Sequence, residues 1–430
     1  STVTNLTTTS GNVYGKSWNV TNGSNYTISS VATTGQTSFK FGNTGTNDAI
    51  YPYYNTVAGA SNVMLFLTNG SKLILLAANA ISGQNSTSQL RTSGTMLISS
   101  NALADFQVSI DSSTISNVLT KAGAGTLNLG ASNSFAGGLI VSEGTVNATN
   151  SSSLGAGTLT VNGGAVNATA DNAWTGSKAL TINGGTATFL GSNNYTGITT
   201  LNGGTLRLSN SAALGASNTT GTFVFAGGTV EALADYDLGH TYGTATNNGT
   251  NSWLKLDGQT VAINGAMTFN VASGATLGLY KISGNTNSAN VITKSGPGTL
   301  QLKGGGVTSI TADWNINEGT LFINTTASGG LGTNNTLVMN GGNLLLSKGV
   351  GSNGTYSGGG QDTPISVLAD TIITLDPNEN AASGANTASF PSLSVGTKTI
   401  QVRKGANTKS SATDPNYADP QLSFKSATLT

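Results

Sequence analysis

The stretch KAGAGTLNLGASNSFAGGLIVSEGTVNATN, residues 121–150, consists almost entirely of Gly, Ser, Thr, Asn and small apolar residues. In the segment TLNL, residues 126–129, Leu127 and Leu129 alternate with polar residues. This alternation has the period of a β-strand with one buried face. The Glu-Gly pair that ends at Gly144 marks a turn requiring positive φ. The stretch is therefore interpreted as part of a larger array of strands and tight turns.

The element GTL and its variants recur in three copies along the chain. Successive elements are separated by 19, 13 and 7 residues in the first copy, 19, 17 and 7 in the second, and 21, 16 and 7 in the third. Each copy carries a Leu-Gly pair just before its third element. This agreement indicates a repeat of about 60 residues that holds three coils. The elements begin at Gly125, Gly144, Gly157, Gly164, Gly185, Gly204, Gly221, Gly228, Gly298, Gly319, Asn335 and Gly342.

Short strands, tight Gly turns and the lack of any long helical pattern predict an all-β protein, a parallel β-helix or β-solenoid. Its backbone hydrogen bonds would run between successive coils, with apolar residues stacked inside and Thr and Asn ladders outside. At about 20 residues per coil the chain would form roughly 20 coils, and the usual strand spacing then predicts a rod on the order of 100 Å long.

The repeat resembles the autotransporter-associated β-strand repeat. That pattern runs Lys-x-Gly-x-Gly-Thr-Leu-x-Leu, then Asn-x-Tyr/Phe-x-Gly, then Gly-Thr-Leu. The third copy lacks the Asn-x-Tyr/Phe-x-Gly part. The resemblance covers residues 119–347 and implies a secreted, right-handed parallel β-helix of bacterial surface proteins, without implying an activity. A passenger, a fragment and a secreted relative all stay open. The matching residues are Lys121, Gly123, Gly125, Asn133, Phe135, Gly137, Gly144, Asn193, Tyr195, Gly197, Gly204, Lys294, Gly296 and Gly298.

Charged residues make up 8% of the chain, the net charge is zero and there is no cysteine. A neutral chain lacks the basic footprint of nucleic-acid binding or of attraction to an anionic membrane surface. The absence of cysteine excludes disulfides and thiolate metal sites and is compatible with export. No stretch of 18 or more apolar residues predicts a membrane span. An extracellular or bacterial cell-surface location is expected.

Three segments are predicted. Residues 1–100 lack the repeat and are expected to be an N-terminal cap or the first coils; residues 101–356 form the repeat-built β-helix. Residues 357–430 contain five of the seven prolines. This last segment is expected to be a C-terminal cap, a small β domain or an extended arm.

The densest group of titratable residues comprises Glu231, Asp235, Asp237 and His240. Two nearby carboxylates could act as an acid/base pair or bind Ca²⁺. A solvated insertion after the second repeat copy is the preferred interpretation. Asp376 and Asp414 begin Asp-Pro-Asn segments that offer oxygen ligands, but their spacing fits no known calcium loop and suits ordinary turns. No cofactor is predicted, with Ca²⁺ as the alternative.

Other features favour structural roles. Glu143 and Glu318 occupy the same repeat position, where Asn202 stands in the second copy, so they are interpreted as turn residues and not as a catalytic pair. The glycine-rich runs lack the helix that nucleotide binding requires. Phe135 and Tyr195 are expected to pack at coil corners. As an alternative, the aromatic rings of Tyr195, Trp174, Trp253 and Trp314 could stack on sugars.

These observations predict a non-catalytic extracellular structural protein, a subunit of a surface filament, fibre or surface layer. Self-association head to tail or by strand addition is expected, since an open β edge pairs readily. The first alternative is an adhesin-type passenger that binds glycans or other surface proteins. A polysaccharide-degrading β-helix enzyme is the second, but its groove would need clustered charges, and Arg91, Arg207 and Arg403 are far apart in sequence.

Overall fold

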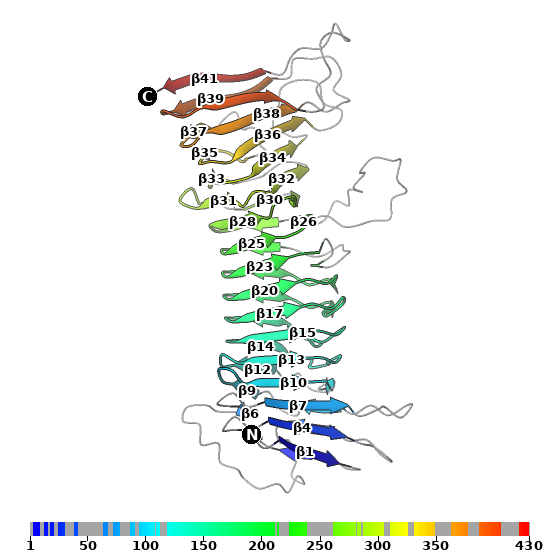
Figure 1. The fold of residues 1–430 in the computed structure, drawn as a ribbon. Helices are drawn as coiled ribbons and strands as arrows, with labels where there is room; N and C mark the ends of the chain where they lie inside the picture. Colours follow the sequence, from blue (N-terminus) through cyan, green and yellow to red (C-terminus); the bar gives the residue numbers. More distant parts are fainter. Residues whose placement is uncertain are drawn as a thin grey trace. The chain divides into compact units, whose positions relative to one another are not determined.

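The computed structural model describes residues 3–8, 13–15, 18–20, 25–30, 38–41, 63–67, 72–77, 87–90, 94–107, 109–111, 118–210, 213–214, 223–238, 261–280, 282–284, 287–304, 310–325, 331–348, 363–376, 387–405 and 421–429. For the strands before residue 94, the backbone path and register are described. All regular structure in these residues is β-strand, and the strands stack in parallel coils (Figure 1). The predicted all-β solenoid is confirmed.

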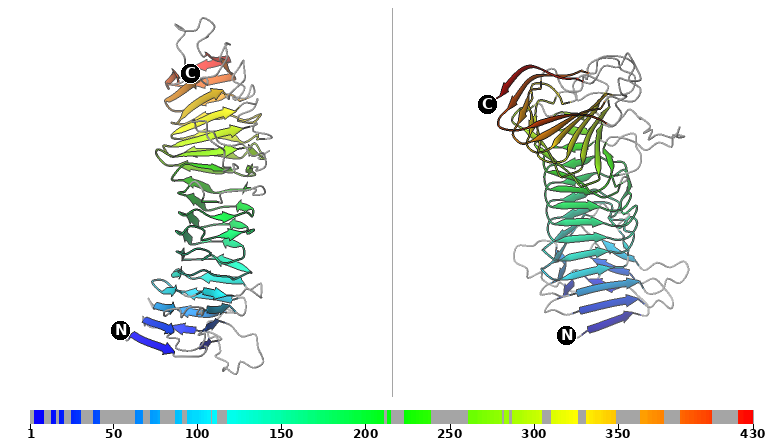
Figure 2. Two further views of the ribbon diagram at one scale, coloured as in Figure 1. Left: turned by 90° about the vertical axis from the view of Figure 1, so that its right-hand side faces the viewer. Right: turned by 45° about the horizontal axis from the view of Figure 1, so that its top comes forward.

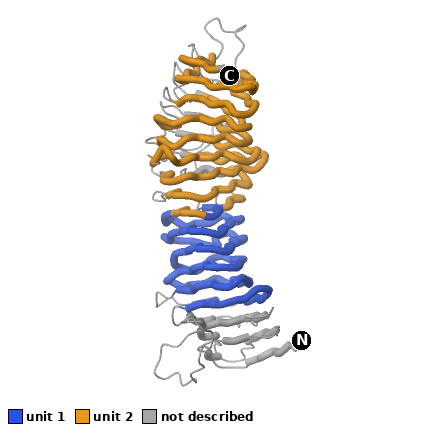
Figure 3. The backbone as a smooth tube through the Cα atoms, turned by 90° about the vertical axis from the view of Figure 1, so that its left-hand side faces the viewer, with its two compact units in different colours: residues 1–198, 204–206, 212–216 blue, residues 199–203, 207–211, 217–430 orange. Residues whose placement is uncertain are grey.

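The chain divides into two compact units (Figure 3). The first contains residues 1–198, 204–206 and 212–216, and the second contains residues 199–203, 207–211 and 217–430. The strand β23 (Thr205–Leu208) has residues in both. The predicted segment boundaries near residues 100 and 356 are a separate proposition and stay a prediction.

The described residues of unit 1 form three stacks of parallel strands and one short pair. The first stack is β1 (Val3–Thr8), β4 (Asn25–Ser30), β7 (Lys72–Ala77), β10 (Leu103–Phe106), β13 (Thr126–Leu129), β15 (Thr145–Ala148), β17 (Ala165–Ala168) and β20 (Thr186–Phe189). The second is β3 (Trp18–Val20), β6 (Val63–Leu67), β9 (Gly94–Ile98), β12 (Val118–Ala122), β14 (Gly138–Val141), β16 (Leu159–Val161) and β19 (Leu180–Ile182). The third is β2 (Val13–Gly15), β5 (Ser38–Phe41), β8 (Thr87–Leu90) and β11 (Ser109–Asp111), and the short pair is β18 (Thr175–Gly176) with β21 (Asn194–Tyr195).

The described residues of unit 2 also form three stacks. Figure 2 shows its coils following one another from green to red. The first is β25 (Thr229–Ala232), β28 (Met267–Val271), β31 (Val291–Ser295), β33 (Asp313–Ile316), β35 (Leu337–Met339), β37 (Ile365–Val367), β39 (Thr387–Val395) and β41 (Gln421–Leu429). The second is β22 (Thr199–Leu201), β24 (Phe223–Phe225), β27 (Val261–Ile263) and β30 (Ile282–Ser283). The third is β26 (Tyr236–Leu238), β29 (Thr276–Tyr280), β32 (Thr299–Gly304), β34 (Thr320–Thr325), β36 (Asn343–Lys348), β38 (Thr371–Asp376) and β40 (Ile400–Lys404).

The alternation read from the sequence decides which side chains enter the core. In β13, Leu127 and Leu129 are fully buried, whereas Thr126 and Asn128 are half-buried on the outer face. Leu127 pairs with Val146 of the next coil, and Val146 pairs with Val166 of the coil after that. The apolar side chains therefore stack in a continuous row across these coils, which buries them from water.

The outer face of unit 1 carries the expected asparagine ladder. Asn147 Nδ2 donates to Asn128 Oδ1 at 2.9 Å, and Asn167 Nδ2 donates to Asn147 Oδ1 at 3.0 Å. A carboxamide both donates and accepts, so each asparagine can continue the row. The partners are 19 and 20 residues apart, which confirms the predicted coil length of about 20 residues.

Several coils of unit 2 are longer. Asn270 lies 39 residues after Glu231 on the neighbouring strand, and Thr363 lies 28 residues after its hydrogen-bond partner Asn335. These longer coils explain why the described residues hold 17 strands of the first-stack type, where roughly 20 coils are expected. The right-handed sense of the coils rests on the sequence resemblance and on the general preference of parallel crossovers.

The repeat glycines divide into two kinds. Gly144 has φ of 68°, as the sequence predicts for a turn glycine. Gly125 does not have positive φ; a Cβ there would lie 2.3 Å from the Ser99 carbonyl oxygen, so close backbone approach is its reason. Gly164, Gly185, Gly204, Gly228 and Gly319 resemble the first, and Gly157 and Gly298 the second. At Gly342 a Cβ would instead lie 2.4 Å from the side-chain atom Ile316 Cγ2. Gly221 lies outside the described residues.

Candidate functional site

Two buried lysines occupy equivalent corners, one in each unit. Lys121 Nζ donates to the backbone carbonyls of Ala122 at 3.1 Å, Gly123 at 2.6 Å and Glu143 at 3.1 Å. Lys121 is 0% exposed. Its ammonium therefore finds a carbonyl for each of its three donors, two in its own turn and one in the turn of the next coil.

Lys294 repeats this arrangement in unit 2. Its Nζ donates to the carbonyls of Ser295 at 2.8 Å, Gly296 at 2.6 Å and Glu318 at 3.0 Å, and the side chain is 0% exposed. We call each set of a lysine and its three carbonyls a lysine corner. The lysine corners satisfy backbone oxygens that would otherwise be buried without a donor.

Each lysine corner lies where the turn between two stacks shortens. The lengths are counted from the row that contains Met96, Lys121 and Val141 to the first residue of the next strand. In unit 1 this connection has six residues at 97–102, four at 122–125, which is the lysine corner, and three at 142–144. In unit 2 the same sequence of lengths occurs at 270–275, 295–298 and 317–319. The lysine side chain fills the space where a wider turn meets a narrower one.

The glycine above each lysine is equally constrained. A Cβ on Gly144 would lie 2.6 Å from Lys121 Nζ and 2.3 Å from the Gly125 carbonyl oxygen. A Cβ on Gly319 would lie 2.8 Å from Lys294 Nζ. The Lys-x-Gly-x-Gly and Glu-Gly parts of the repeat therefore form one contact set that spans two coils.

Burial perturbs both ammonium groups. Desolvation lowers the pKa of Lys121 and of Lys294 from 10.5 to about 8, and the charges of Glu143 and Glu318 partly oppose this shift. Glu143 and Glu318 have exposed side chains, and each lies in the turn directly above its lysine corner, Glu143 in unit 1 and Glu318 in unit 2.

The repeat asparagine clamps neighbouring coils together. Asn133 Oδ1 accepts from Ile110 N at 2.7 Å, and its Nδ2 donates to the Ser153 carbonyl at 2.6 Å, with partners 23 residues before and 20 residues after. In the second copy, Asn193 accepts from Trp174 N at 3.1 Å and donates to the Ala213 carbonyl at 2.9 Å. Each buried amide thereby joins its own coil to the coils on both sides.

The repeat aromatics pack inside the coils. Phe135 is fully buried against Gly155, and Tyr195 packs on Trp174 with ring centroids 4.4 Å apart. The expected corner packing of Phe135 and Tyr195 is confirmed. The alternative of sugar stacking is wrong for Trp174 and Trp314, because both side chains are 0% exposed and their indole N–H groups donate hydrogen bonds to backbone carbonyls. Trp253 lies outside the described residues.

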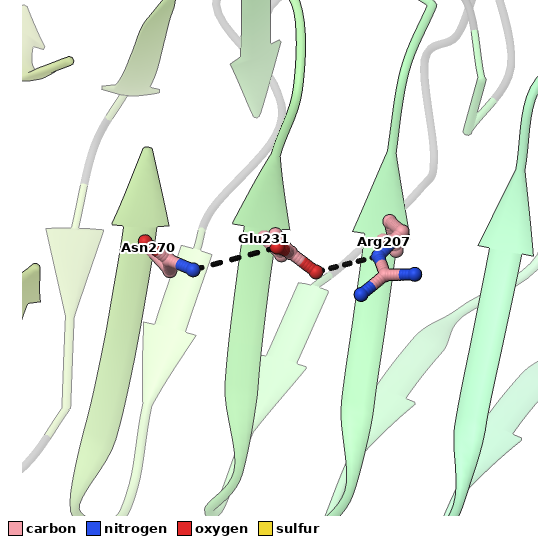
Figure 4. A network of polar contacts seen from close by, with 3 residues as sticks. All are labelled: Arg207, Glu231 and Asn270. Carbon is pink, nitrogen blue, oxygen red and sulfur yellow. Dashed lines mark hydrogen bonds and ion pairs between the residues drawn. The ribbon is translucent and has the colours of Figure 1, made fainter. Parts of the chain in front are cut away.

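One charged network lies on the outer face of unit 2 (Figure 4). Arg207 Nε donates to Glu231 Oε2 at 2.5 Å, and Asn270 Nδ2 donates to Glu231 Oε1 at 3.4 Å. The three side chains come from the neighbouring strands β23, β25 and β28. Glu231 therefore accepts from donors on both neighbouring strands and continues a ladder of polar contacts across them.

The other titratable candidates do not converge within the described residues. Asp235 Oδ1 accepts from Thr276 N at 2.8 Å, as a turn residue would. Asp237 lies in β26, where the backbone is described, and Asp376 lies against Gly405. His240, Asp414 and Arg91 lie outside the described residues, and the described part of the chain holds no group of three or more His, Cys, Asp or Glu suited to a metal ion.

The repeat pattern includes Lys121 and Lys294 but does not predict which groups they contact. The signal was present, because a lone lysine stands in an apolar row: Lys121 pairs with Met96 below and Val141 above. A charged residue at a core position must be paired, and the adjacent glycines supply bare carbonyls. The chemistry of the corners is therefore hydrogen bonding between coils.

Comparison with known families agrees with this geometry. Residues 119–148, 184–208 and 292–322 match the passenger-associated-transport-repeat family. In these segments the chain is similar to the repeats of autotransporter passengers that fold as β-helices. Its repeats indicate the passenger domain of an autotransporter and imply a secreted or cell-surface protein. No curated protein and no solved structure matches the chain. None of the residues that the structure describes forms a helix long and apolar enough to cross a membrane.

Proposed function

We propose that this passenger-like protein is a non-catalytic structural subunit of an extracellular filament, fibre or surface layer. The observation that carries the proposal is the use of the repeat residues. Lys121, Lys294, Asn133 and Asn193 all direct their polar atoms to backbone groups that join adjacent coils. The side chains that define the repeat thus serve the stack itself.

The charge distribution supports a role without catalysis. Acid/base catalysis needs titratable groups held within reach of one reacting bond. In the described residues, the acidic candidates Glu231, Asp235 and Asp376 lie on different strands or turns and contact separate partners. The outer rows consist mainly of uncharged Asn and Thr, which are suited to regular contacts between molecules.

Electron microscopy of the material in its native location tests this proposal. Continuous fibres or a lattice that bind antibodies against this chain are expected, and isolated particles at every concentration would contradict it. Incubation with a panel of polysaccharides supplies a second test. Release of reducing sugar that disappears in the Asp235→Asn variant would favour the enzyme alternative.

An adhesin-type passenger is the second candidate, and one observation favours it. Leu190 and Ile198 of unit 1 are large apolar side chains with 43% and 48% exposure. Exposed apolar side chains are common contact points for partners. Binding of the protein to glycan arrays or to cell-surface extracts, lost in the Leu190→Asn and Ile198→Asn variants, would favour this candidate.

A further inference from the structure

The outer face of the third stack in unit 2 carries an aromatic side chain. In β34 the buried positions alternate with Thr320 and Phe322, which point outward and are half-buried. Phe322 pairs in register with Leu345 of β36, which is also outward and half-buried. By contrast, the outward positions of β13 in unit 1 hold Thr126 and Asn128. This part of the outer face therefore presents apolar groups where β13 presents polar ones.

The other neighbour of Phe322 is Gln301 of β32, the strand that precedes β34 in the stack (Figure 1). Leu300 and Leu302 flank it and are fully buried, so Gln301 belongs to the outer face, yet it is only 9% exposed. No other residue that the structure describes forms a hydrogen bond with its carboxamide. Holding an amide largely away from water without a partner is unfavourable. Gln301 therefore does not serve the stack in the way that the repeat asparagines do.

A row of hydroxyl groups runs beside these side chains. Thr276, Thr299 and Thr320 pair in register across β29, β32 and β34, and Asn343 of β36 continues the row. All four are half-buried. Asn343 Oδ1 accepts from Ile372 N at 3.2 Å, whereas its Nδ2 has no partner among the described residues. The outer strip of unit 2 is the name we give to six of these residues: Thr299, Gln301, Thr320, Phe322, Asn343 and Leu345.

The outer strip has the chemistry of a sugar-binding surface. A pyranose has apolar C–H groups on its ring faces and hydroxyl groups at its edge, so it can stack on an aromatic ring while neighbouring amides and hydroxyls bind that edge. The six residues of the strip carry no charge. They therefore lack the cations with which proteins bind phosphate, carboxylate or nucleic-acid ligands.

We propose that the outer strip of unit 2 binds a neutral, extended glycan chain, with a sugar ring stacked on Phe322 and its hydroxyl groups hydrogen-bonded to the carboxamide of Gln301. The proposal goes beyond the structural function, and it uses none of the residues that favour an adhesin in unit 1. A second copy of the protein, packed face to face on the strip, is the competing occupant. It is disfavoured because an apolar contact between two sheets would bury the unpartnered amide of Gln301 completely.

The shape of the strip selects an extended glycan. Gln301, Phe322 and Leu345 lie in one row across strands that are spaced about 4.8 Å apart. A β-linked glucan such as cellohexaose is a nearly flat ribbon with equatorial hydroxyl groups and apolar ring faces, so successive rings can follow this row. The α-linked maltohexaose has the same composition but coils, so fewer of its rings can contact the strip.

Titration calorimetry of the purified protein with these two hexamers tests the proposal. We expect cellohexaose to bind, and maltohexaose to bind at least about tenfold more weakly, because each lost contact lowers the binding free energy. Polygalacturonate, an acidic extended glycan, is expected not to bind, because the strip offers its carboxylates no cation.

Three variants locate the site. Gln301→Leu keeps the approximate volume of the side chain but removes the amide, so the affinity for cellohexaose should fall about fivefold to tenfold while urea denaturation shows unchanged or increased stability. Phe322→Thr suits an outward strand position but removes the ring, and the affinity should fall at least about tenfold. Val338→Thr, at a half-buried outward position of β35 in the first stack of unit 2, is the matched control and should leave the affinity unchanged. Circular dichroism checks that all three variants fold.

The outcomes decide between the glycan and the other occupants. Binding of cellohexaose that is lost in Gln301→Leu and Phe322→Thr but kept in Val338→Thr supports the proposal. Binding that all three variants retain, or no binding to the native protein, overturns it. Stronger binding of polygalacturonate than of cellohexaose overturns the neutral ligand class. If no hexamer binds and light scattering shows self-association that Phe322→Thr prevents, the strip is a contact between copies and the proposal is wrong. Fibres in native material remain the separate test of the structural function, and their absence would not affect the glycan result.

Discussion

The first and third family matches contain a lysine corner, and the second match does not. Ile182 stands at the position that Lys121 and Lys294 occupy in the other two copies, and it lies just before the second match begins. The turn that follows, residues 183–185, has three residues, whereas a lysine corner has four. The positive φ of the turn glycine is nearly the same at Gly185 and Gly144. The lysine is therefore not needed to turn the chain. It accompanies the longer corner, whose additional carbonyl would otherwise be buried without a donor.

The largest expected effect comes from filling the space above the lysine. Gly319→Ala places a Cβ 2.3 Å from the Gly298 carbonyl oxygen and 2.8 Å from Lys294 Nζ, at φ of 67°. We expect a loss of about 3–5 kcal/mol in the free energy of unfolding, from strain and overpacking together. Gly274→Ala is the control, since Gly274 also has positive φ but nothing lies within 4 Å. Urea denaturation should show a loss of about 1 kcal/mol there; equal losses would contradict the argument from contact.

Removing the ammonium should cost somewhat less. Lys294→Met keeps most of the apolar stem but leaves the carbonyls of Gly296 and Glu318 without their donor. Leaving buried acceptors unpaired costs about 2–4 kcal/mol. Ile316→Met, in the same row one coil later, is the matched control and should cost under about 1.5 kcal/mol. If both variants unfold at the same urea concentration, the lysine corner contributes no specific stability.

The lowered lysine pKa values predict a pH dependence. Below about pH 8 the ammonium groups are charged in both the folded and the unfolded chain, and the desolvation penalty is present in full. Between about pH 8 and 10.5 the unfolded chain binds more protons, so the free energy of unfolding rises with pH. We expect this rise in the native protein but not in the double variant Lys121→Met/Lys294→Met, which lacks both ammonium groups. Parallel pH profiles of the two proteins would contradict this expectation.

The smallest effect should come from the outer ladder. Asn147→Ala removes two half-buried hydrogen bonds, to Asn128 and Asn167, on the outer face of unit 1. Partly solvated hydrogen bonds contribute about 0.5–1 kcal/mol each. Thr145→Ala on the same strand, also half-buried, supplies the control. A loss for Asn147→Ala as large as that for Lys294→Met would show that the outer face, and not the corner, holds the coils together.

The architecture could be predicted from the sequence because its cause is local. Alternation such as that of Leu127 and Leu129 with polar neighbours selects the buried face without reference to distant residues. The role of Asn133 could not be predicted in this way, because its two partners lie 23 and 20 residues away in sequence. The same is true of Lys121, whose third carbonyl belongs to the next coil. The burial of Trp174 and Trp314 follows from their contacts with neighbouring coils, which a single strand does not reveal.

The long coils of unit 2 have a practical consequence. In the neighbouring strands β25 and β28, Val230 pairs with Phe269 and Glu231 pairs with Asn270, as in the shorter coils. The paired positions Glu231 and Asn270 are nevertheless 39 residues apart in sequence. The free-energy cost of closing a loop grows only with the logarithm of its length. Foreign peptides or small domains could therefore be grafted between β26 and β27 without altering the stacked rows. The protein offers a regular scaffold for display at this position.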